Sequence, residues 1–333
     1  GAMRFNSDSQ KLEYFNGDIW MQVHTFSPDL NGGVRGVSNI GNMTPAINTL
    51  EFITISTAGN ATDFGDSTAA RVGGSAPSSR TRGLFAGGNA GAPGYGSLNT
   101  IDYITISSTG NAADFGDLSE PHDYGRNNIS SGTRGVMAGG WPSNNDTIDY
   151  VTIASLGNAL DFGNLNENIG GGPGGGASPT RGVFSGGYYP SPALTSRNTL
   201  QYITIASTGN AQDFGDMTVL RSHTAQASSS TRSVIAMGYN KTPSTGNYDN
   251  QATSEYFTFS TLGNATDFGD MIDSGNSPGA TSDSVRGVYA GGSGSSNVIQ
   301  YINIATTGDA FDFGDMVTTG RLFGAASNGH GGL

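Results

Sequence analysis

One short motif recurs six times along the 333-residue chain, and its spacing constrains the fold more than any other feature. The copies read GNATDFGD, GNAADFGD, GNALDFGN, GNAQDFGD, GNATDFGD and GDAFDFGD. Their phenylalanines, separated by 45 to 54 residues, are Phe64, Phe115, Phe162, Phe214, Phe268 and Phe313. A feature that recurs at a period near fifty predicts a repeat unit made of one supersecondary structure.

Each repeat has the same order of parts, which predicts four short strands, named a to d. A Ser/Ala-rich run such as TAQASSS forms strand a, and a run such as RGLFAGG (82–88) forms strand b. IDYITIS (101–107) and its relatives form strand c, and the motif forms strand d after a turn such as STGN. An aromatic residue of strand c precedes the motif phenylalanine by 12 residues in every copy. Because loop length fixes hairpin register, this constancy predicts one preserved c–d hairpin.

The two ends of the chain complement each other. VRGVSNIGN (34–42) begins with a strand b that no strand a precedes, whereas the final GRLFGAASNGHGGL resembles a strand a that no strand b follows. Pairing of these ends would remove exposed sheet edges. The sequence therefore predicts an all-β fold: a six-bladed β-propeller of four-stranded antiparallel blades, closed by N- and C-terminal strand pairing and preceded by a short β-meander.

Three segments are expected along the chain. Residues 1–3 are interpreted as a cloning scar, and residues 34–333 as the propeller. Residues 4–33 are expected to form an N-terminal β-meander and linker, with an Asn-Gly hairpin at Asn16–Gly17.

Two resemblances to known families follow from these residues. The double glycine of strand b and the aromatic residues of strands c and d resemble the kelch-like β-propeller repeat. The chain departs from that family in its motif phenylalanine, where tryptophan is usual, and in its first copy, which lacks the double glycine. RFNSDSQKLEYFNGDIWMQV (4–23) resembles a segment of tail-fibre and other virion proteins of tailed bacteriophages. That resemblance implies a place in the virion, other virion proteins as partners, and a possible homotrimer.

Composition argues against several classes of function. The net charge is −12 and lysine occurs only at positions 11 and 241, which disfavours nucleic acid as a partner. The absence of cysteine excludes disulfides and thiol chemistry. No stretch approaches 18 apolar residues, so no membrane insertion is expected. The four histidines show no metal-site spacing, and no metal or cofactor is expected.

Several repeated features have both a structural and a chemical interpretation. A kinase-like D-F-G would need a strand lysine and an H-R-D loop, and neither is visible. The motif aspartates could bind calcium, but turn formation is the favoured interpretation. One arginine per repeat is expected to brace a neighbouring backbone rather than hold an anion. These arginines are Arg35, Arg82, Arg134, Arg181, Arg232 and Arg286. GGGPGGG (170–176) is expected to be a flexible connection.

The variable loops between strands b and c are the best candidates for function, because binding residues concentrate on loops of rigid scaffolds. They carry six unrepeated aromatic residues that suit sugar stacking or protein contacts: Tyr95, Trp141, Tyr188, Tyr189, Tyr239 and Tyr248. No catalytic residue is predicted. The favoured hypothesis is a phage tail-fibre tip or adhesin that binds a host surface glycan or protein. A structural decoration or adaptor propeller and a glycan-cleaving enzyme are the alternatives.

Overall fold

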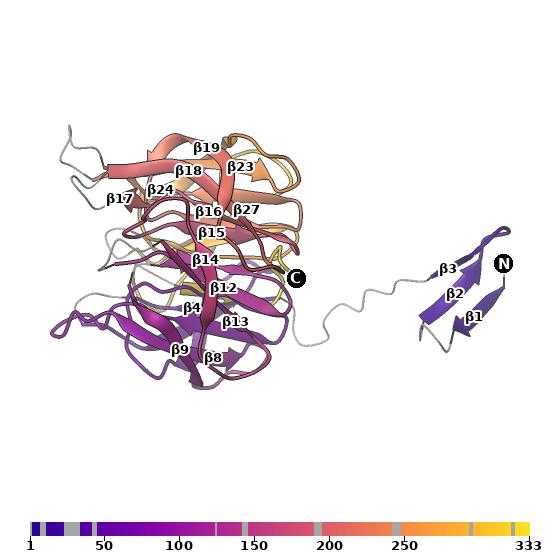
Figure 1. Ribbon diagram of the computed structural model, residues 1–333, viewed down its shortest axis with the longest axis horizontal. Coiled ribbons are helices and arrows are strands. Elements are labelled where there is room, and N and C mark those ends of the chain that lie inside the picture. Colours follow the sequence, from indigo (N-terminus) through magenta and orange to yellow (C-terminus); the bar gives the residue numbers. More distant parts are fainter. Residues whose placement is uncertain are drawn as a thin grey trace. The chain divides into compact units, whose positions relative to one another are not determined.

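The computed structural model divides the chain into two compact units, residues 1–33 and 34–333. It describes residues 2–6, 11–22, 34–41, 45–123, 125–141, 146–189, 195–241, 248–292, 296–320 and 324–333. Every element in these residues is a β-strand, and they include no helix (Figure 1).

The first unit is a three-stranded antiparallel meander. Its strands are β1 (Met3–Asn6), β2 (Lys11–Phe15) and β3 (Trp20–Gln22). The Asn16 Oδ1 atom accepts hydrogen bonds from the backbone N–H groups of Asp18 and Ile19, both at 2.9 Å. Asn16 thereby fixes the turn between β2 and β3, and the predicted hairpin at Asn16–Gly17 is confirmed.

The second unit gathers its described strands into six sheets, numbered here in chain order. Sheet 1 contains β29 (Gly324–Ser327), β4 (Arg35–Asn39), β5 (Thr49–Thr54) and β6 (Thr62–Asp66). Sheet 2 contains β7 (Arg82–Ala86), β8 (Leu98–Thr105) and β9 (Ala113–His122). Sheet 3 contains β11 (Ile129–Ser130), β12 (Arg134–Ala138), β13 (Thr147–Thr152) and β14 (Leu160–Asn164). Sheet 4 contains β10 (Arg126–Asn127), β15 (Gly174–Ala177), β16 (Arg181–Ser185), β17 (Tyr188–Tyr189), β18 (Thr195–Thr204) and β19 (Gln212–Arg221). Sheet 5 contains β20 (Ala225–Ser228), β21 (Arg232–Ala236), β22 (Tyr239–Asn240), β23 (Asp249–Thr258) and β24 (Thr266–Gly275). Sheet 6 contains β25 (Gly279–Ser282), β26 (Arg286–Ala290), β27 (Val298–Asn303) and β28 (Phe311–Asp315).

The predicted pairing of the two ends of the repeat region is confirmed. β29 runs antiparallel to β4, with Gly324 opposite Asn39 and Ser327 opposite Gly36. The backbone N–H of Arg35 also donates to Asn328 Oδ1 at 2.8 Å. The C-terminal strand therefore belongs to the same sheet as the first described strand of this unit.

The prediction of four strands in every sheet is wrong for sheets 2, 4 and 5, which contain three, six and five strands. In sheet 2 the segment before β7 pairs with β7 itself through isolated bridges at Ser75 and Ser78. Pro77 lies between them and has no N–H to donate, so a continuous ladder cannot form there. Sheet 4 gains a short parallel pair between β10 and β15.

The prediction of a flexible connection at residues 170–176 is also wrong for its second half. Gly174–Ala177 forms strand β15, and all four residues are buried. A Cβ on Gly176 would lie 2.4 Å from Ser228 Oγ, and one on Gly175 would lie 2.4 Å from Asn127 Cβ. Glycine is therefore needed because side chains of neighbouring segments occupy the space beside this strand.

The hydrophobic core lies between neighbouring sheets rather than within one layer. One buried cluster joins Leu50 and Phe64 of sheet 1 to Ile104 of sheet 2. Another joins Ile299 and Phe313 of sheet 6 to Ile55, which follows β5 of sheet 1. The motif phenylalanines are all buried, with exposed fractions of 2 to 3%, so each helps to seal one such contact.

The D-F-G motif also joins neighbouring sheets through backbone hydrogen bonds. The glycine of each S/T-x-G-N/D turn donates its N–H to the motif phenylalanine carbonyl of the preceding sheet, at 2.7 to 2.9 Å. The donor–acceptor pairs are Gly110–Phe64, Gly157–Phe115, Gly209–Phe162, Gly263–Phe214, Gly308–Phe268 and Gly59–Phe313. The last pair links sheet 6 to sheet 1. The recurring D-F-G triplet therefore has a structural role, because its phenylalanine carbonyl joins neighbouring sheets.

The expected bracing role of the recurring arginines is confirmed. Each guanidinium lies over the strand-c aromatic ring of its own sheet, 4.2 to 4.8 Å from the ring centroid. Each also donates to a backbone carbonyl of the next sheet. Arg134, for example, lies over Tyr150 and reaches the Ile205 carbonyl at 2.8 Å. A planar cation suits both contacts at once.

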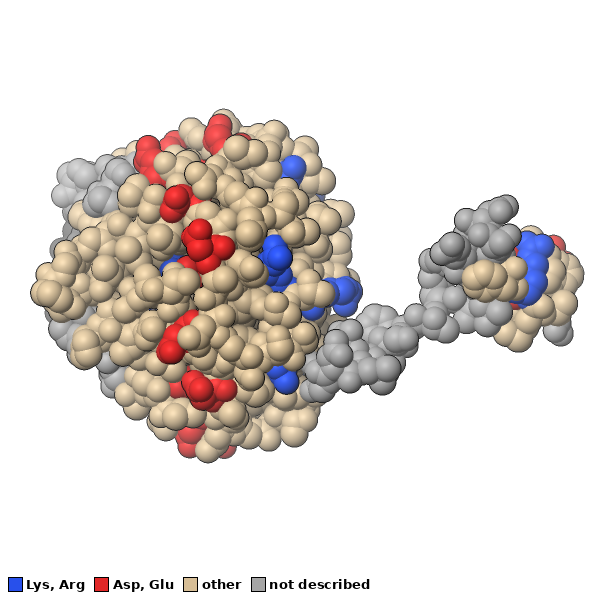
Figure 2. All heavy atoms as spheres, turned by 90° about the horizontal axis from the view of Figure 1, so that it is seen from below, with Lys and Arg blue, Asp and Glu red and all other residues tan. Residues whose placement is uncertain are grey.

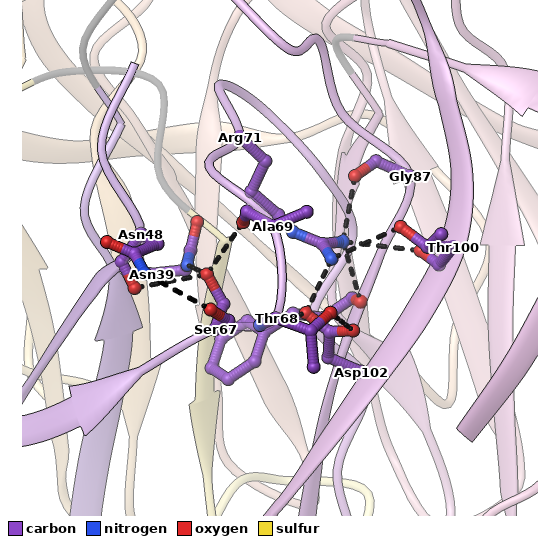
Figure 3. A network of polar contacts seen from close by, with 10 residues as sticks. Asn39, Asn48, Ser67, Thr68, Ala69, Arg71, Gly87, Thr100 and Asp102 are labelled. Carbon is purple, nitrogen blue, oxygen red and sulfur yellow. Dashed lines mark hydrogen bonds and ion pairs between the residues drawn. The ribbon is translucent and has the colours of Figure 1, made fainter. Parts of the chain in front are cut away.

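A second set of contacts between sheets was not foreseen from the sequence. One buried carboxylate or amide on each strand c accepts a hydrogen bond from the backbone N–H two residues after the D-F-G-D/N motif of the preceding sheet. These acceptors are Glu51, Asp102, Asp149, Gln201, Glu255 and Gln300. Figure 3 shows one example, in which Asp102 accepts from Thr68 N at 3.1 Å and pairs with buried Arg71 at 2.6 Å.

Serine side chains join the strand-a segments of neighbouring sheets. Ser78 Oγ donates to the Ser327 carbonyl at 2.8 Å, and Ser282 Oγ donates to the Ser228 carbonyl at 2.9 Å. Residues 328–333 follow this ladder, and a ring nitrogen of His330 lies 3.0 Å from the Ser78 carbonyl and 3.1 Å from Ser130 Oγ. His330 thereby contacts the strand-a segments of sheets 2 and 3.

Candidate functional site

The loops between strands b and c lie beside the connections that lead from strand d to the next strand a. Asn89, Trp141, Tyr188 and Tyr239 each follow the glycine pair that ends strand b, or its Met-Gly equivalent in sheet 5. Each forms a backbone bridge with the connection from the preceding sheet, at Val72, Asp123, Gly171 and Ser222. Three of the six predicted site residues therefore occupy one equivalent position in sheets 3, 4 and 5.

Three of the predicted residues gather into one aromatic cluster with a histidine. The rings of Tyr188 and His223 are parallel within 2°, with centroids 5.7 Å apart. His223 also stacks on Tyr239 at 4.7 Å, and Tyr239 meets Tyr248 edge-on at 4.9 Å. The cluster thus continues from half-buried Tyr188, through buried Tyr239, to Tyr248, which is 58% exposed.

Backbone geometry holds His223 inside this cluster. The residue adopts a positive φ of 60°, and its N–H donates to the Gly172 carbonyl at 2.8 Å. A Cβ on Gly172 would lie 2.5 Å from His223 Nδ1, so glycine is required opposite the imidazole. His223 is one of four histidines that lie scattered along the sequence. Its place in the connection beside an aromatic loop was the only available signal.

A cation accompanies the exposed end of the cluster. Lys241 Nζ donates to Tyr248 Oη at 2.9 Å and lies 4.2 Å from the centroid of the same ring. Lys241 follows β22, which carries Tyr239, whereas Tyr248 lies just before β23. Both ends of one b–c loop therefore contribute a polar group to the exposed aromatic surface.

The other aromatic residues lie outside this cluster. Tyr189 packs under the Arg197 guanidinium, 5.0 Å from its carbon atom, and Arg197 Nε lies 3.5 Å from Glu167. Tyr95 and Trp141 are 55% and 40% exposed on the loops of sheets 2 and 3. The six predicted residues thus divide into the Tyr188–Tyr239–Tyr248 cluster, the separate Tyr189, and a second group at sheets 2 and 3.

A buried polar pair supports this second group. Asn89 Nδ2 donates to Asp123 Oδ2 at 2.8 Å and to the Tyr95 carbonyl at 3.2 Å. Asp123 exchanges two backbone hydrogen bonds with Trp141, both at 3.0 Å. Burial raises the pKa of Asp123 to about 6, and the hydrogen bond from Asn89 acts in the opposite direction. Tyr95 adopts a φ of 43°, so its loop holds an uncommon backbone conformation.

Acidic side chains dominate another part of the surface. The first aspartate of every D-F-G motif is exposed, and Figure 2 shows acidic side chains following one another in a line on this unit. Within the described residues no group of three or more His, Asp or Glu side chains is placed to hold a metal ion. The same part of the chain contains no helix that could cross a membrane.

Comparison with known proteins gives no family assignment. No protein-family model matches the chain, and no curated protein matches its sequence. What the protein does must therefore be argued from the geometry of the two aromatic groups.

Proposed function

We propose that residues 34–333 form a closed six-bladed β-propeller of the kelch-like kind. Three sets of contacts between sheets support this proposal: the turn-glycine hydrogen bonds, the arginine braces, and the buried acceptors on strand c. Each set includes a contact between sheet 6 and sheet 1, at Gly59–Phe313, Arg286–Ile55 and Val317–Glu51. A scaffold closed in this way has no open inter-sheet edge and is rigid enough to position surface loops.

We further propose that the protein is a tail-fibre tip or adhesin of a phage virion that binds a host surface glycan or protein. The observation that carries the binding part is the Tyr188–His223–Tyr239–Tyr248 cluster, which ends in an exposed ring beside Lys241. An exposed tyrosine supported by stacked rings offers an apolar face and a polar edge, and sugars and protein surfaces use both. The virion location rests on the resemblance of residues 4–23 alone.

A binding experiment with matched variants tests this function. Purified protein is applied to a glycan array, and its ability to block adsorption of candidate phages to host cells is measured. Tyr248→Ala should weaken binding about five- to thirtyfold, because stacking on an exposed aromatic ring contributes about 1–2 kcal/mol. Phe311→Ala removes an aromatic residue of similar exposure, 59%, from strand β28 and should leave binding unchanged.

The same experiment separates the alternatives. A structural decoration or adaptor propeller would bind other virion proteins and neither glycans nor cells. A glycan-cleaving enzyme would release product from a bound glycan, whereas an adhesin would bind without product. Equal binding by the Tyr248→Ala variant and the unmodified protein would contradict the proposed site.

A further inference from the structure

We propose that the ligand is a chain-like glycan that contacts both aromatic groups at once, the Trp141–Tyr95 group and the Tyr188–Tyr239–Tyr248 cluster. This inference rests on the proposed binding function and adds the class of ligand. It begins from the observation that Trp141, Tyr188 and Tyr239 occupy one equivalent position on three consecutive sheets.

Equivalent positions on consecutive sheets place aromatic residues at repeated points of the scaffold. Trp141 is 40% exposed and Tyr188 is half-buried, whereas buried Tyr239 packs against Tyr248, which is 58% exposed. A polymer of similar units presents similar apolar faces at intervals, and the exposed rings of Trp141 and Tyr248 can stack on two of them. A compact ligand would contact the aromatic residues of one sheet and would leave those of the other sheets without a contact.

The two groups differ in their polar surroundings. At sheets 2 and 3, buried Asp123 accepts a hydrogen bond from Asn89 and pairs with the backbone of Trp141, while Asn89 also donates to the Tyr95 carbonyl, so this pair positions the aromatic residues rather than meeting the ligand. At sheet 5, the Lys241 ammonium and Tyr248 hydroxyl supply donors at the rim of the ring.

The shape of the site favours surface binding over enclosure. One cavity among the described residues of this region, lined by His122, Met137 and Asp149, measures only about 10 Å³. That volume is about the least that a single water needs and is far below that of a sugar ring. In this proposal the sugar therefore lies on the outside of the loops, where one stacking contact is weak. Two linked contacts on one chain would raise affinity through their effective concentration.

Calorimetry with oligosaccharides of increasing length tests the inference. The probes are neutral glucan, mannan and chitin fragments of one, two, four and eight units, titrated into the full chain. The account predicts, for one series, an affinity at least tenfold higher for eight units than for one or two. Trp141→Ala and Tyr248→Ala should each lower the affinity for the eight-unit oligosaccharide at least tenfold. Trp141→Phe, which keeps a ring, should retain most of it, and Phe311→Ala should have no effect.

Each alternative outcome has a distinct meaning. A monosaccharide that binds as tightly as its octamer would overturn the chain-like ligand, and so would an octamer affinity that depends on only one aromatic group. Failure of all glycans with retained binding to host cells would indicate a protein ligand, and it would overturn this inference while leaving the proposed binding function intact. Failure of both glycan and cell binding would overturn the two together.

Discussion

At the scale of single residues, the glycine of D-F-G is explained by contact between sheets. Gly116 has a φ of 148°, and a Cβ there would lie 2.5 Å from the Gly157 carbonyl oxygen of the next sheet. Gly110, in a turn, has nearly the same φ of 150° but open space around its Cβ position. The two residues share backbone strain and differ in packing, so they form a matched pair.

Substitution of these two glycines should separate strain from packing. Gly110→Ala should cost about 1 kcal/mol of unfolding free energy, because only the uncommon φ is penalised. Gly116→Ala should cost at least about 3 kcal/mol, because the neighbouring backbone must also move. Denaturant unfolding of both variants measures the difference. Equal losses would show that the contact between sheets does not explain the motif.

The buried acceptors on strand c give a second prediction at this scale. Asp102 faces buried Arg71, and Glu255 faces buried Arg221 at 2.5 Å, whereas Gln201 has Ile169 at the equivalent position. In these three sheets the charge of the acceptor thus matches its neighbour. Removing one partner of a buried ion pair leaves an uncompensated charge, which typically costs about 3–5 kcal/mol.

Asp102→Asn alone should therefore lower the unfolding free energy by about 3 kcal/mol. The double variant Asp102→Gln with Arg71→Ile copies the pair in sheet 4 and should recover most of that loss. Thermal unfolding of the two variants checks this. A double variant less stable than Asp102→Asn would mean that the pairs are not interchangeable between sheets.

At the scale of elements, His330, which follows β29, contacts Ser78 and Ser130 of two other sheets. Burial lowers the pKa of His330 to about 4, and its hydrogen bond with the Ser78 carbonyl acts in the opposite direction. The folded protein therefore excludes a proton that the unfolded chain binds near pH 6.5. Stability from this residue is complete above pH 6.5 and decreases as the pH falls toward 4.

The expected loss between pH 6.5 and 4 is about 3 kcal/mol of unfolding free energy. Asp123 has the opposite sign, because its raised pKa makes the folded state bind a proton more tightly below pH 6. Comparison of the unmodified protein with His330→Gln at each pH cancels the Asp123 contribution. The difference between the two should shrink by about 3 kcal/mol as the pH falls from 7 to 4. A constant difference would contradict a buried neutral His330.

Elements with a fixed local pattern were the ones that sequence reasoning predicted. Constant spacing revealed the c–d hairpins, recurrence revealed the arginine braces, and complementary ends revealed the pairing of β29 with β4. The buried acceptors on strand c could not be predicted in this way, because Asp102 and Thr68 share no sequence signal. β15 was missed because its glycines are selected by side chains of other segments, including Asn127 and Ser228.

The candidate site was likewise predicted only in part. Aromatic residues on variable loops could be listed from the sequence, but their grouping could not. Tyr188 and Tyr239 come together only because adjacent sheets place equivalent positions side by side with His223 between them. Tyr189, next to Tyr188 in sequence, instead packs against Arg197.

At the scale of the whole molecule, the proposed closed propeller depends on one pairing that joins the two ends of the repeat region. β29 follows sheet 6 along the chain and pairs with β4 of sheet 1. In the proposed propeller this pairing joins the last sheet to the first. Loop positions, and hence the aromatic surface, depend on that closure. The chain has no cysteine, so an introduced pair can form only one intramolecular disulfide.

The most direct test is oxidation of the double variant Ser38→Cys with Ala325→Cys, two residues that oppose each other across β4 and β29. The account predicts a rapid disulfide in the folded monomer, detected by mass spectrometry, and a gain of about 4 kcal/mol in unfolding free energy from so long a closed loop. A control pair, Ser38→Cys with the exposed Ser155→Cys of sheet 3, should not crosslink. Failure of the first pair to crosslink in the folded protein would contradict closure.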